Sequence, residues 1–161
     1  MFGLQLHPAV VHYPIALGVV GAAALLAYAI VRREWMRWFG PILLTLALAG
    51  SGVAYFTGES SQDGAERAGV PMEAISRHEE TAVWSIGVLA LATLLGWASS
   101  ASRRGVWMAA PIAVAAAALT LWSAHLGGRL VFVYGAGHVP ESAAQSETQP
   151  RIGNEGVGEK P

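Results

Sequence analysis

The sequence predicts an all-α membrane protein, an antiparallel bundle of four transmembrane helices. Three features lead to this fold class: the composition, four long apolar segments, and the arginine and tryptophan residues at the segment ends. Of the 161 residues, 53% are hydrophobic and only 13% are charged, and the mean hydropathy is +0.43. This composition is too apolar and too poor in charge for an ordinary soluble domain.

The composition also excludes several classes of function. A net charge of -1 and the lack of a basic run argue against nucleic acid as a partner. Because the chain has no cysteine, disulfides, iron–sulfur clusters and covalent c-type haem attachment are excluded. Histidine and carboxylate remain as the available ligand chemistry.

Four apolar segments have the length of about 20 residues that crosses a bilayer core. They cover approximately residues 13–31, 39–57, 81–101 and 106–126. Because lipid offers no partners to free backbone N–H and C=O groups, these segments are expected to be helices. The first is expected to be a retained helix rather than a cleaved signal peptide, since residues 1–6 contain no lysine or arginine.

Charged and aromatic residues at the segment ends predict the orientation. The first link carries Arg32, Arg33 and Arg37, and the third carries Arg103 and Arg104. The positive-inside rule then places both links in the cytoplasm and both termini outside. Tryptophans at both levels fit an aromatic belt, with Trp35, Trp38, Trp97 and Trp107 on the inner side and Trp84 and Trp122 on the outer side.

Local signals predict where the helices begin. Pro8 suits the first turn of a helix, so His7 would flank the first helix and His12 would lie one turn inside it. If both were helical, five positions would separate the two histidines by about 140°. Ser76 to Glu79 has the S-x-x-E form of a capping box, which predicts that the third helix begins at Ser76 with His78 in its first turn.

The last helix is predicted to end near residue 126. His125 would lie in the last turn, with Gly127 and Gly128 as the stop. Residues 127–138 are apolar but too short to cross a bilayer, and are expected to form an extension along the outer interface. Residues 139–161 lack a periodic apolar face and are expected to be a flexible exterior tail. The domains are therefore predicted as residues 1–138 and 139–161.

Four of the five histidines are predicted to lie at the outer membrane face. They come from three helices: His7, His12, His78 and His125. The fifth, His138, follows in the exterior part of the chain. Ionisable side chains at a membrane span are expensive and mark a candidate site.

One interpretation of this layer is a b-type haem, or two. Two imidazoles from different helices would supply the axial ligands, and basic groups near the membrane surface would pair with the propionates. Helices one and three lie diagonally in a sequentially wound bundle, so His12 with His78 is the favoured pair, with His125 and His7 as further candidates. The remaining haem-binding candidates are Arg77 and Arg129 for the propionates and Trp84, Trp122 and Tyr55 for the slot.

Other interpretations stay open. The same histidines, with Glu79 or Glu80, could hold copper, zinc or iron directly. They could instead serve a quinone or relay protons, or be interfacial residues with their polar tips in the headgroups. No nucleophile triad, P-loop or dinucleotide fingerprint occurs, which favours an electron-transfer subunit, or a structural subunit of a larger complex, over an independent enzyme.

Two signatures carry a resemblance to a known family. They are His7-Pro8-x-x-x-His12-x-Pro14-Ile15 and Gly127-Gly128-x-Leu130-Val131-x-x-Tyr134-Gly135-x-Gly137, joined by the histidine of the third helix. Over about residues 4–138 the chain resembles the bacterial membrane family known as domain of unknown function 2231 (DUF2231). Many members have a further histidine where this chain has Tyr134.

The resemblance implies a small four-helix protein of the bacterial inner membrane in a redox setting. Some members are fused to, or encoded with, Rieske-type iron–sulfur domains and other redox proteins. Together with the histidine layer, this leads to the expected function: electron transfer through haem b between a membrane partner and a periplasmic one, such as a Rieske-type protein or a c-type cytochrome.

Overall fold

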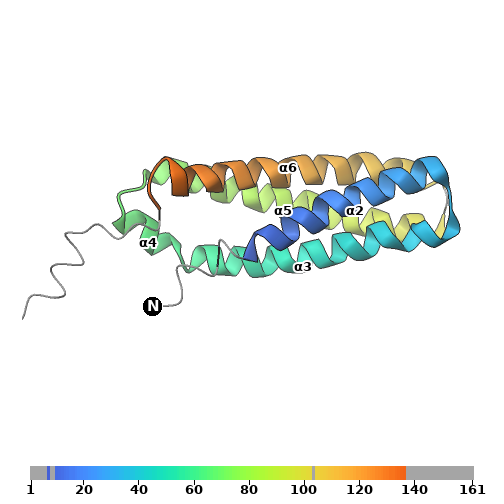
Figure 1. Cartoon of the computed structure of the whole chain (residues 1–161), viewed down its shortest axis with the longest axis horizontal. Helices are drawn as coiled ribbons and strands as arrows, with labels where there is room; N and C mark the ends of the chain where they lie inside the picture. Colours follow the sequence, from blue (N-terminus) through green and yellow to red (C-terminus); the bar gives the residue numbers. More distant parts are fainter. Residues whose placement is uncertain (1–6, 8–9, 103, 137–161) are drawn as a thin grey trace, which may run out of the picture.

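Four long helices make up the body of the protein (Figure 1). The computed structural model describes residue 7, residues 10–102 and residues 104–136. The long helices are α2 (His12–Val31), α3 (Phe39–Glu59), α5 (Met72–Ala101) and α6 (Val106–Phe132). A 3-10 helix, η2 (Glu34–Trp38), precedes α3, and a short helix, α4 (Gln62–Arg67), lies between α3 and α5. No strand occurs in the described part of the chain, so the predicted all-α class is confirmed.

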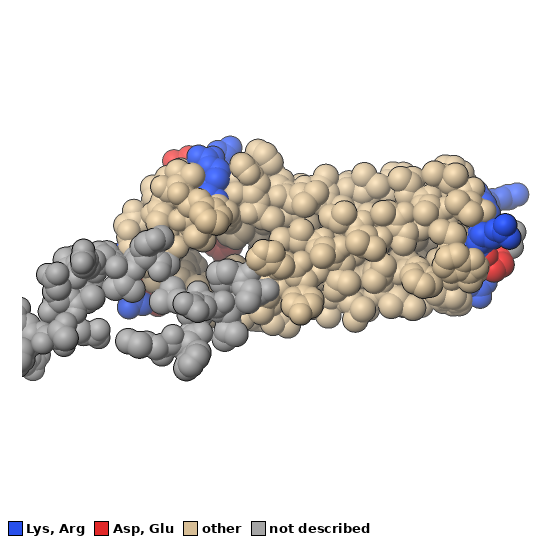
Figure 2. Space-filling model, viewed as in Figure 1, with Lys and Arg blue, Asp and Glu red and all other residues tan. Residues whose placement is uncertain are grey.

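All four long helices are long and apolar enough to cross a membrane. Figure 2 shows the charged side chains gathered at the two ends of the molecule, with a belt free of them in between. This distribution matches a bilayer around the middle of the bundle, because charged side chains are costly in the hydrocarbon region. The predicted four-helix membrane bundle is confirmed.

The helices form an antiparallel square. α2 packs against α3 and α6, and α5 packs against the same two helices. α2 and α5 are therefore diagonal, as predicted for the first and third helices. We call the end with His12, His78 and His125 the histidine end, and the opposite end, with Arg32 and Arg104, the arginine end.

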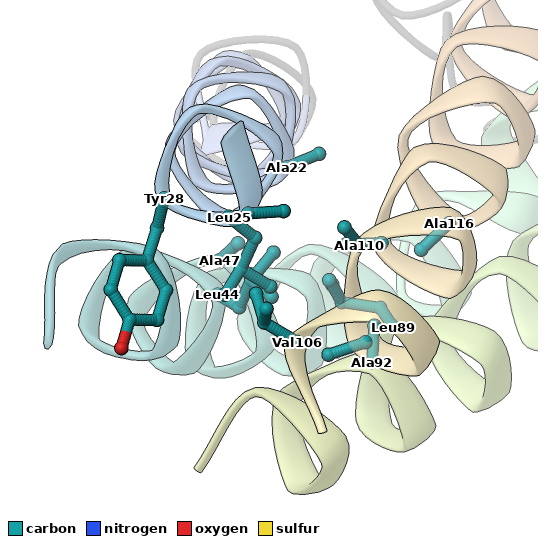
Figure 3. Packing of buried hydrophobic residues seen from close by; sticks show 13 residues of the cluster. Ala22, Leu25, Tyr28, Leu44, Ala47, Leu89, Ala92, Val106, Ala110 and Ala116 are labelled. Atoms are coloured by element: carbon teal, nitrogen blue, oxygen red, sulfur yellow. The ribbon is translucent and has the colours of Figure 1, made fainter. Parts of the chain in front are cut away.

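The tightly packed core occupies the half of the bundle towards the arginine end. Its larger members are Leu25 and Tyr28 of α2, Leu44 of α3, Leu89 of α5 and Val106 of α6, all at most 2% exposed. Alanines fill the spaces between these side chains (Figure 3). Small residues allow close approach of helix backbones, which drives helix association in lipid.

The third transmembrane helix begins four residues earlier than predicted. Pro71 is its N-cap, with an extended ψ of 130°, and its carbonyl accepts hydrogen bonds from the N–H groups of Ala74 and Ile75. Ser76 therefore lies inside the helix, and the capping-box prediction is wrong. The restricted backbone before and at a proline decides this boundary more strongly than the S-x-x-E pattern.

The last helix also extends beyond its predicted end. α6 runs through Gly127 and Gly128 to Phe132, so the first half of the expected interfacial extension is helical. The turn that follows contains Gly135 at φ 75°, and the Ala136 N–H donates to the Leu130 carbonyl at 2.8 Å. A glycine with positive φ is the usual stop of a helix, whereas glycine inside one costs only about 1 kcal/mol. The boundary predicted at residues 138 and 139, and His138 itself, lie outside the described residues.

Candidate functional site

A cavity of about 550 Å³ opens at the histidine end, between all four long helices. Figure 2 shows the hollow on the surface near this end. Its walls are mainly apolar, with contributions from Val11, Pro14, Ile15, Ala54, Ala82 and Ile86. Its polar groups are His7, His12, Tyr55, Glu59, His78 and Glu79, and the hydroxyls of Ser51, Ser85, Thr120 and Ser123.

The sequence explains why this end is hollow. Where the arginine half has Leu25 and Leu44, the cavity walls have glycine, alanine and serine, among them Gly58, Gly127 and Gly128. Too little side-chain volume is therefore available to fill the space between the helices.

His7 is held by a hydrogen bond to a threonine hydroxyl of α3. Its Nδ1 lies 3.2 Å from Oγ1 of Thr57 on α3. The Thr57 hydroxyl donates its proton to the carbonyls of Val53 and Ala54, each at 3.0 Å, so towards His7 it acts as an acceptor. His7 therefore carries its proton on Nδ1, and in the neutral ring Nε2 keeps a free lone pair. Burial lowers the pKa of His7, and this favours the neutral ring. A backbone hydrogen bond at Ala54 raises the pKa but is the smaller of the two effects.

His78 has the same arrangement on the other side of the bundle. It projects from α5, and its Nδ1 lies 3.1 Å from the backbone carbonyl of Ser123 on α6. A carbonyl only accepts hydrogen bonds, so Nδ1 is the donor and Nε2 of the neutral ring is again the free nitrogen. Histidines that bind metals in proteins are usually oriented in this way, with the second nitrogen bonded to a carbonyl or carboxylate.

Each of these two imidazoles lies against a glycine. A Cβ atom on Gly58 would lie 2.9 Å from Cε1 of His7, and one on Gly127 would lie 3.0 Å from Cε1 of His78. The first distance is shorter than real Cβ contacts, and at the second the His78 ring would have to shift by a few tenths of an ångström. Gly127 was predicted only to end the last helix, and no role was predicted for Gly58. In the predicted bundle each histidine and its glycine already lie at about the same depth, and this shared depth was the signal from which the contact could have been predicted.

The structure brings three of the four predicted histidines to one cavity. His7, His12 and His78 line it, although His12 is exposed. His125 is exposed as well and stacks on Trp122, with ring centroids 5.4 Å apart. Its position among the ligands was predicted from depth alone, and the helical rotation places it on the outer side of α6, away from the cavity walls.

Of the other predicted site residues, one lines the cavity and four do not. Tyr55 lines the cavity, whereas Trp84 and Trp122 are 72% and 56% exposed and are not part of its walls, contrary to the expected slot. Arg77 and Arg129 line a separate, smaller pocket instead. Leu130 borders both spaces, so the two arginines lie beside the cavity and not in it.

A pair of buried hydroxyls in the cavity wall was not predicted. Ser85 Oγ of α5 lies 3.2 Å from Thr120 Oγ1 of α6. Thr120 donates to the Ala116 carbonyl at 2.8 Å, so Ser85 is the donor between the two hydroxyls. Single serine and threonine residues within an apolar helix gave no sign that they would meet across the bundle.

A direct metal site receives no geometric support from the described part of the chain. There, no group of three or more histidine and acidic side chains is arranged to hold a metal ion. Zinc sites usually need at least three protein ligands. What the described cavity walls offer is imidazole side chains within mainly apolar surroundings.

Comparison with known proteins identifies the family. The family model described as "Predicted membrane protein (DUF2231)" matches residues 3–140. The chain belongs to the DUF2231 family. The match includes all four long helices, and both signatures that carried the resemblance contribute to the DUF2231 cavity walls, through His7 and His12 at one end and Gly127 and Gly128 at the other. No curated protein and no solved structure matches the chain.

Proposed function

We propose that this DUF2231 protein is an electron-transfer subunit and that His7 and His78 would hold one b-type haem in the cavity. The observation that supports the proposal best is the pair of imidazoles itself. They come from different segments of the chain, line the same apolar cavity, and each has Nδ1 engaged so that Nε2 is free to bind iron. Bound haem would supply one-electron transfer.

The surroundings of the two histidines fit such a group. A volume of about 550 Å³ lies within the range of about 300–1,000 Å³ that is usual for cofactor and ligand sites. The glycine contacts allow the rings to lie close against the helix backbones. The hydrogen bonds that Nδ1 of each ring donates, to Thr57 Oγ1 and to the Ser123 carbonyl, would hold the ring orientation while the other nitrogen binds.

This assignment changes the axial pair favoured by the sequence. Depth and diagonal packing favoured His12 with His78, but His12 is exposed, whereas His7 is half-buried and its Nδ1 is hydrogen-bonded to Thr57. In the proposal His12 contributes to the cavity wall. His125 has no part in binding.

The charge distribution supports one orientation of the proposed subunit in the membrane. With Arg32, Arg33, Arg37 and Arg104 at the arginine end, the positive-inside rule directs that end to the cytoplasm of a bacterial inner membrane. The histidine end and both termini would then face the periplasm. A haem at this end would exchange electrons with a periplasmic Rieske-type protein or c-type cytochrome.

A second function, quinone binding, is favoured by one observation. The cavity contains the buried Ser85–Thr120 hydroxyl pair and the carboxylates of Glu59 and Glu79, none of which a haem requires. An apolar cavity near a membrane interface with hydroxyl oxygens, imidazoles and carboxylates that can accept and release protons would also suit a quinone head group.

The test is a reduced-minus-oxidised absorption spectrum of the protein purified in detergent from cells supplied with haem precursor. We expect a b-type spectrum in the wild type. The haem absorbance per protein should fall at least tenfold in His7→Ala and in His78→Ala. His125→Ala is the matched control, because this histidine lies at the same end but outside the cavity, and should retain the wild-type spectrum.

Three results would contradict the proposal. A colourless wild-type protein that co-purifies with quinone would establish the second function. Equal loss of haem in His125→Ala would show that the cavity is not the site. Retention of haem in His7→Ala with loss in His12→Ala would move the axial role to His12.

A further inference from the structure

A second pocket lies beside the cavity, between the start of α5 and the end of α6. It has a volume of about 160 Å³. Two guanidinium groups from different helices line it, Arg77 of α5 and Arg129 of α6, together with Tyr134 and Glu73. Leu126 and Leu130 complete an apolar wall.

The end of α6 builds one side of this pocket. Backbone N–H groups of Val133 and Tyr134 donate to the Arg129 carbonyl, at 2.9 and 3.2 Å, and Gly135 at φ 75° turns the chain. This turn places the Tyr134 ring beside the Arg129 guanidinium, whose Cζ atom lies 5.9 Å from the centroid of the ring. Such a cation–π contact favours one position of an otherwise flexible arginine.

The pocket has a surplus of positive charge. Two guanidiniums face one carboxylate, that of Glu73, and within the described residues neither arginine forms an ion pair. Arginine is charged at every physiological pH and offers planar, paired N–H donors that suit phosphate oxygens. The volume is sufficient for a phosphate group and far below that of a nucleotide site.

We infer that this pocket binds the phosphate group of an anionic membrane phospholipid. Its position supports a lipid as the source of the phosphate, because both arginines lie at the ends of membrane-spanning helices. The leucines of the apolar wall belong to α6, which continues into the bilayer, so acyl chains below the phosphate would meet an apolar helix surface. Basic pockets between transmembrane helices are known to bind lipid head groups.

The inference does not depend on the proposed haem. The pocket and the cavity share Leu130, but the arginines are not in the cavity walls. Occupation of one space can therefore be measured without occupation of the other.

The test is native mass spectrometry of the full chain in detergent, titrated with phosphatidylglycerol or with phosphatidylcholine of the same acyl chains. We expect the wild type to bind phosphatidylglycerol more tightly. In the double variant Arg77→Gln/Arg129→Gln the dissociation constant for phosphatidylglycerol should rise at least tenfold. Arg67→Gln is the matched control, since Arg67 is an exposed arginine at the same end, in α4, and should change it less than twofold.

Other outcomes would overturn the inference. An equal loss in Arg67→Gln, or no preference of the wild type between the two lipids, would leave only general electrostatic attraction. Displacement of the lipid by millimolar inorganic phosphate would assign the pocket to a soluble phosphate. Unchanged lipid affinity with loss of haem absorbance in the double variant would assign the arginines to the haem carboxylates. Circular dichroism and gel filtration of each variant confirm that it is folded.

Discussion

The two halves of this bundle are built from the same four helices but pack in opposite ways. Towards the arginine end, leucine, valine and tyrosine side chains interlock with alanines, and the largest of them are almost fully buried. Towards the histidine end, the helices enclose a cavity of about 550 Å³ lined by imidazoles, hydroxyls and small residues. The arginine half holds the helices together, and the histidine half leaves space between them.

Glycines show the difference most directly. At the arginine end, a Cβ on Gly40 would lie 2.5 Å from Cγ of Leu25, within the packed core. At the histidine end, a Cβ on Gly127 would meet the imidazole of His78 at 3.0 Å. One glycine makes room for the Leu25 side chain of a neighbouring helix, and the other makes room for the His78 imidazole. Substitutions at the two positions should therefore affect different properties.

The largest effect on folding is expected for Gly40→Ala. The added methyl group would overlap the Leu25 side chain and approach its backbone nitrogen at 3.2 Å, so the helices must move apart. Overpacking of this kind typically costs about 1–3 kcal/mol of unfolding free energy. The measurement is unfolding in mixed detergent micelles, followed by circular dichroism.

Gly52→Ala is the control in the same helix. A Cβ on Gly52 meets no atom within 4 Å, and alanine is the better helix former. This variant should be as stable as the wild type or slightly more stable. Equal destabilisation of both variants would show that helix α3 is sensitive to substitution in general, and that the packed half is not special.

A smaller effect, on ligand binding rather than stability, is expected for Gly127→Ala. The methyl group would push the His78 ring out of its position, because the ring is the flexible partner in this contact. Disturbing the support of a metal-binding histidine typically weakens binding about 10- to 100-fold. We expect about a tenfold loss of haem affinity with little change in unfolding.

Gly128→Ala serves as its control, because a Cβ on Gly128 has open space around it. The haem titration should give the same affinity for this variant as for the wild type. If both glycine variants lost haem equally, the contact between Gly127 and His78 would not position the ring.

The smallest effect is a pH dependence that comes from His7. Burial lowers its pKa in the folded protein below the ordinary value of 6.5, so between these two values the unfolded chain binds more protons than the folded one. Above about pH 6.5 His7 is neutral in both states and costs no stability. As the pH falls from 6.5 through its lower pKa in the folded state, protonation favours the unfolded chain and the free energy of unfolding decreases. Unfolding measured at pH 7.5 and at pH 5 should show a loss at pH 5 that is reduced in His7→Gln. An unchanged loss in that variant would attribute the pH effect to other groups.

The sequence by itself determined the membrane bundle. Four segments of sufficient length and apolarity leave few alternatives, because a backbone in lipid must form its own hydrogen bonds. The predictions that were wrong concerned helix boundaries. Ser76 resembled a helix N-cap, and Gly127 with Gly128 resembled the end of a helix. In both cases a stronger local signal, Pro71 or the positive φ of Gly135, decided the boundary.

Depth in the membrane was also readable from the sequence, and it placed four histidines at one end. The direction in which each side chain points was not, because it depends on how the helices rotate against one another. Tertiary packing turned His7 and His78 onto glycines and hydrogen-bond acceptors of neighbouring helices, and turned His125 onto Trp122 on the outer surface. A cavity is a property of space shared by several helices, so only the folded structure decided which residues surround it.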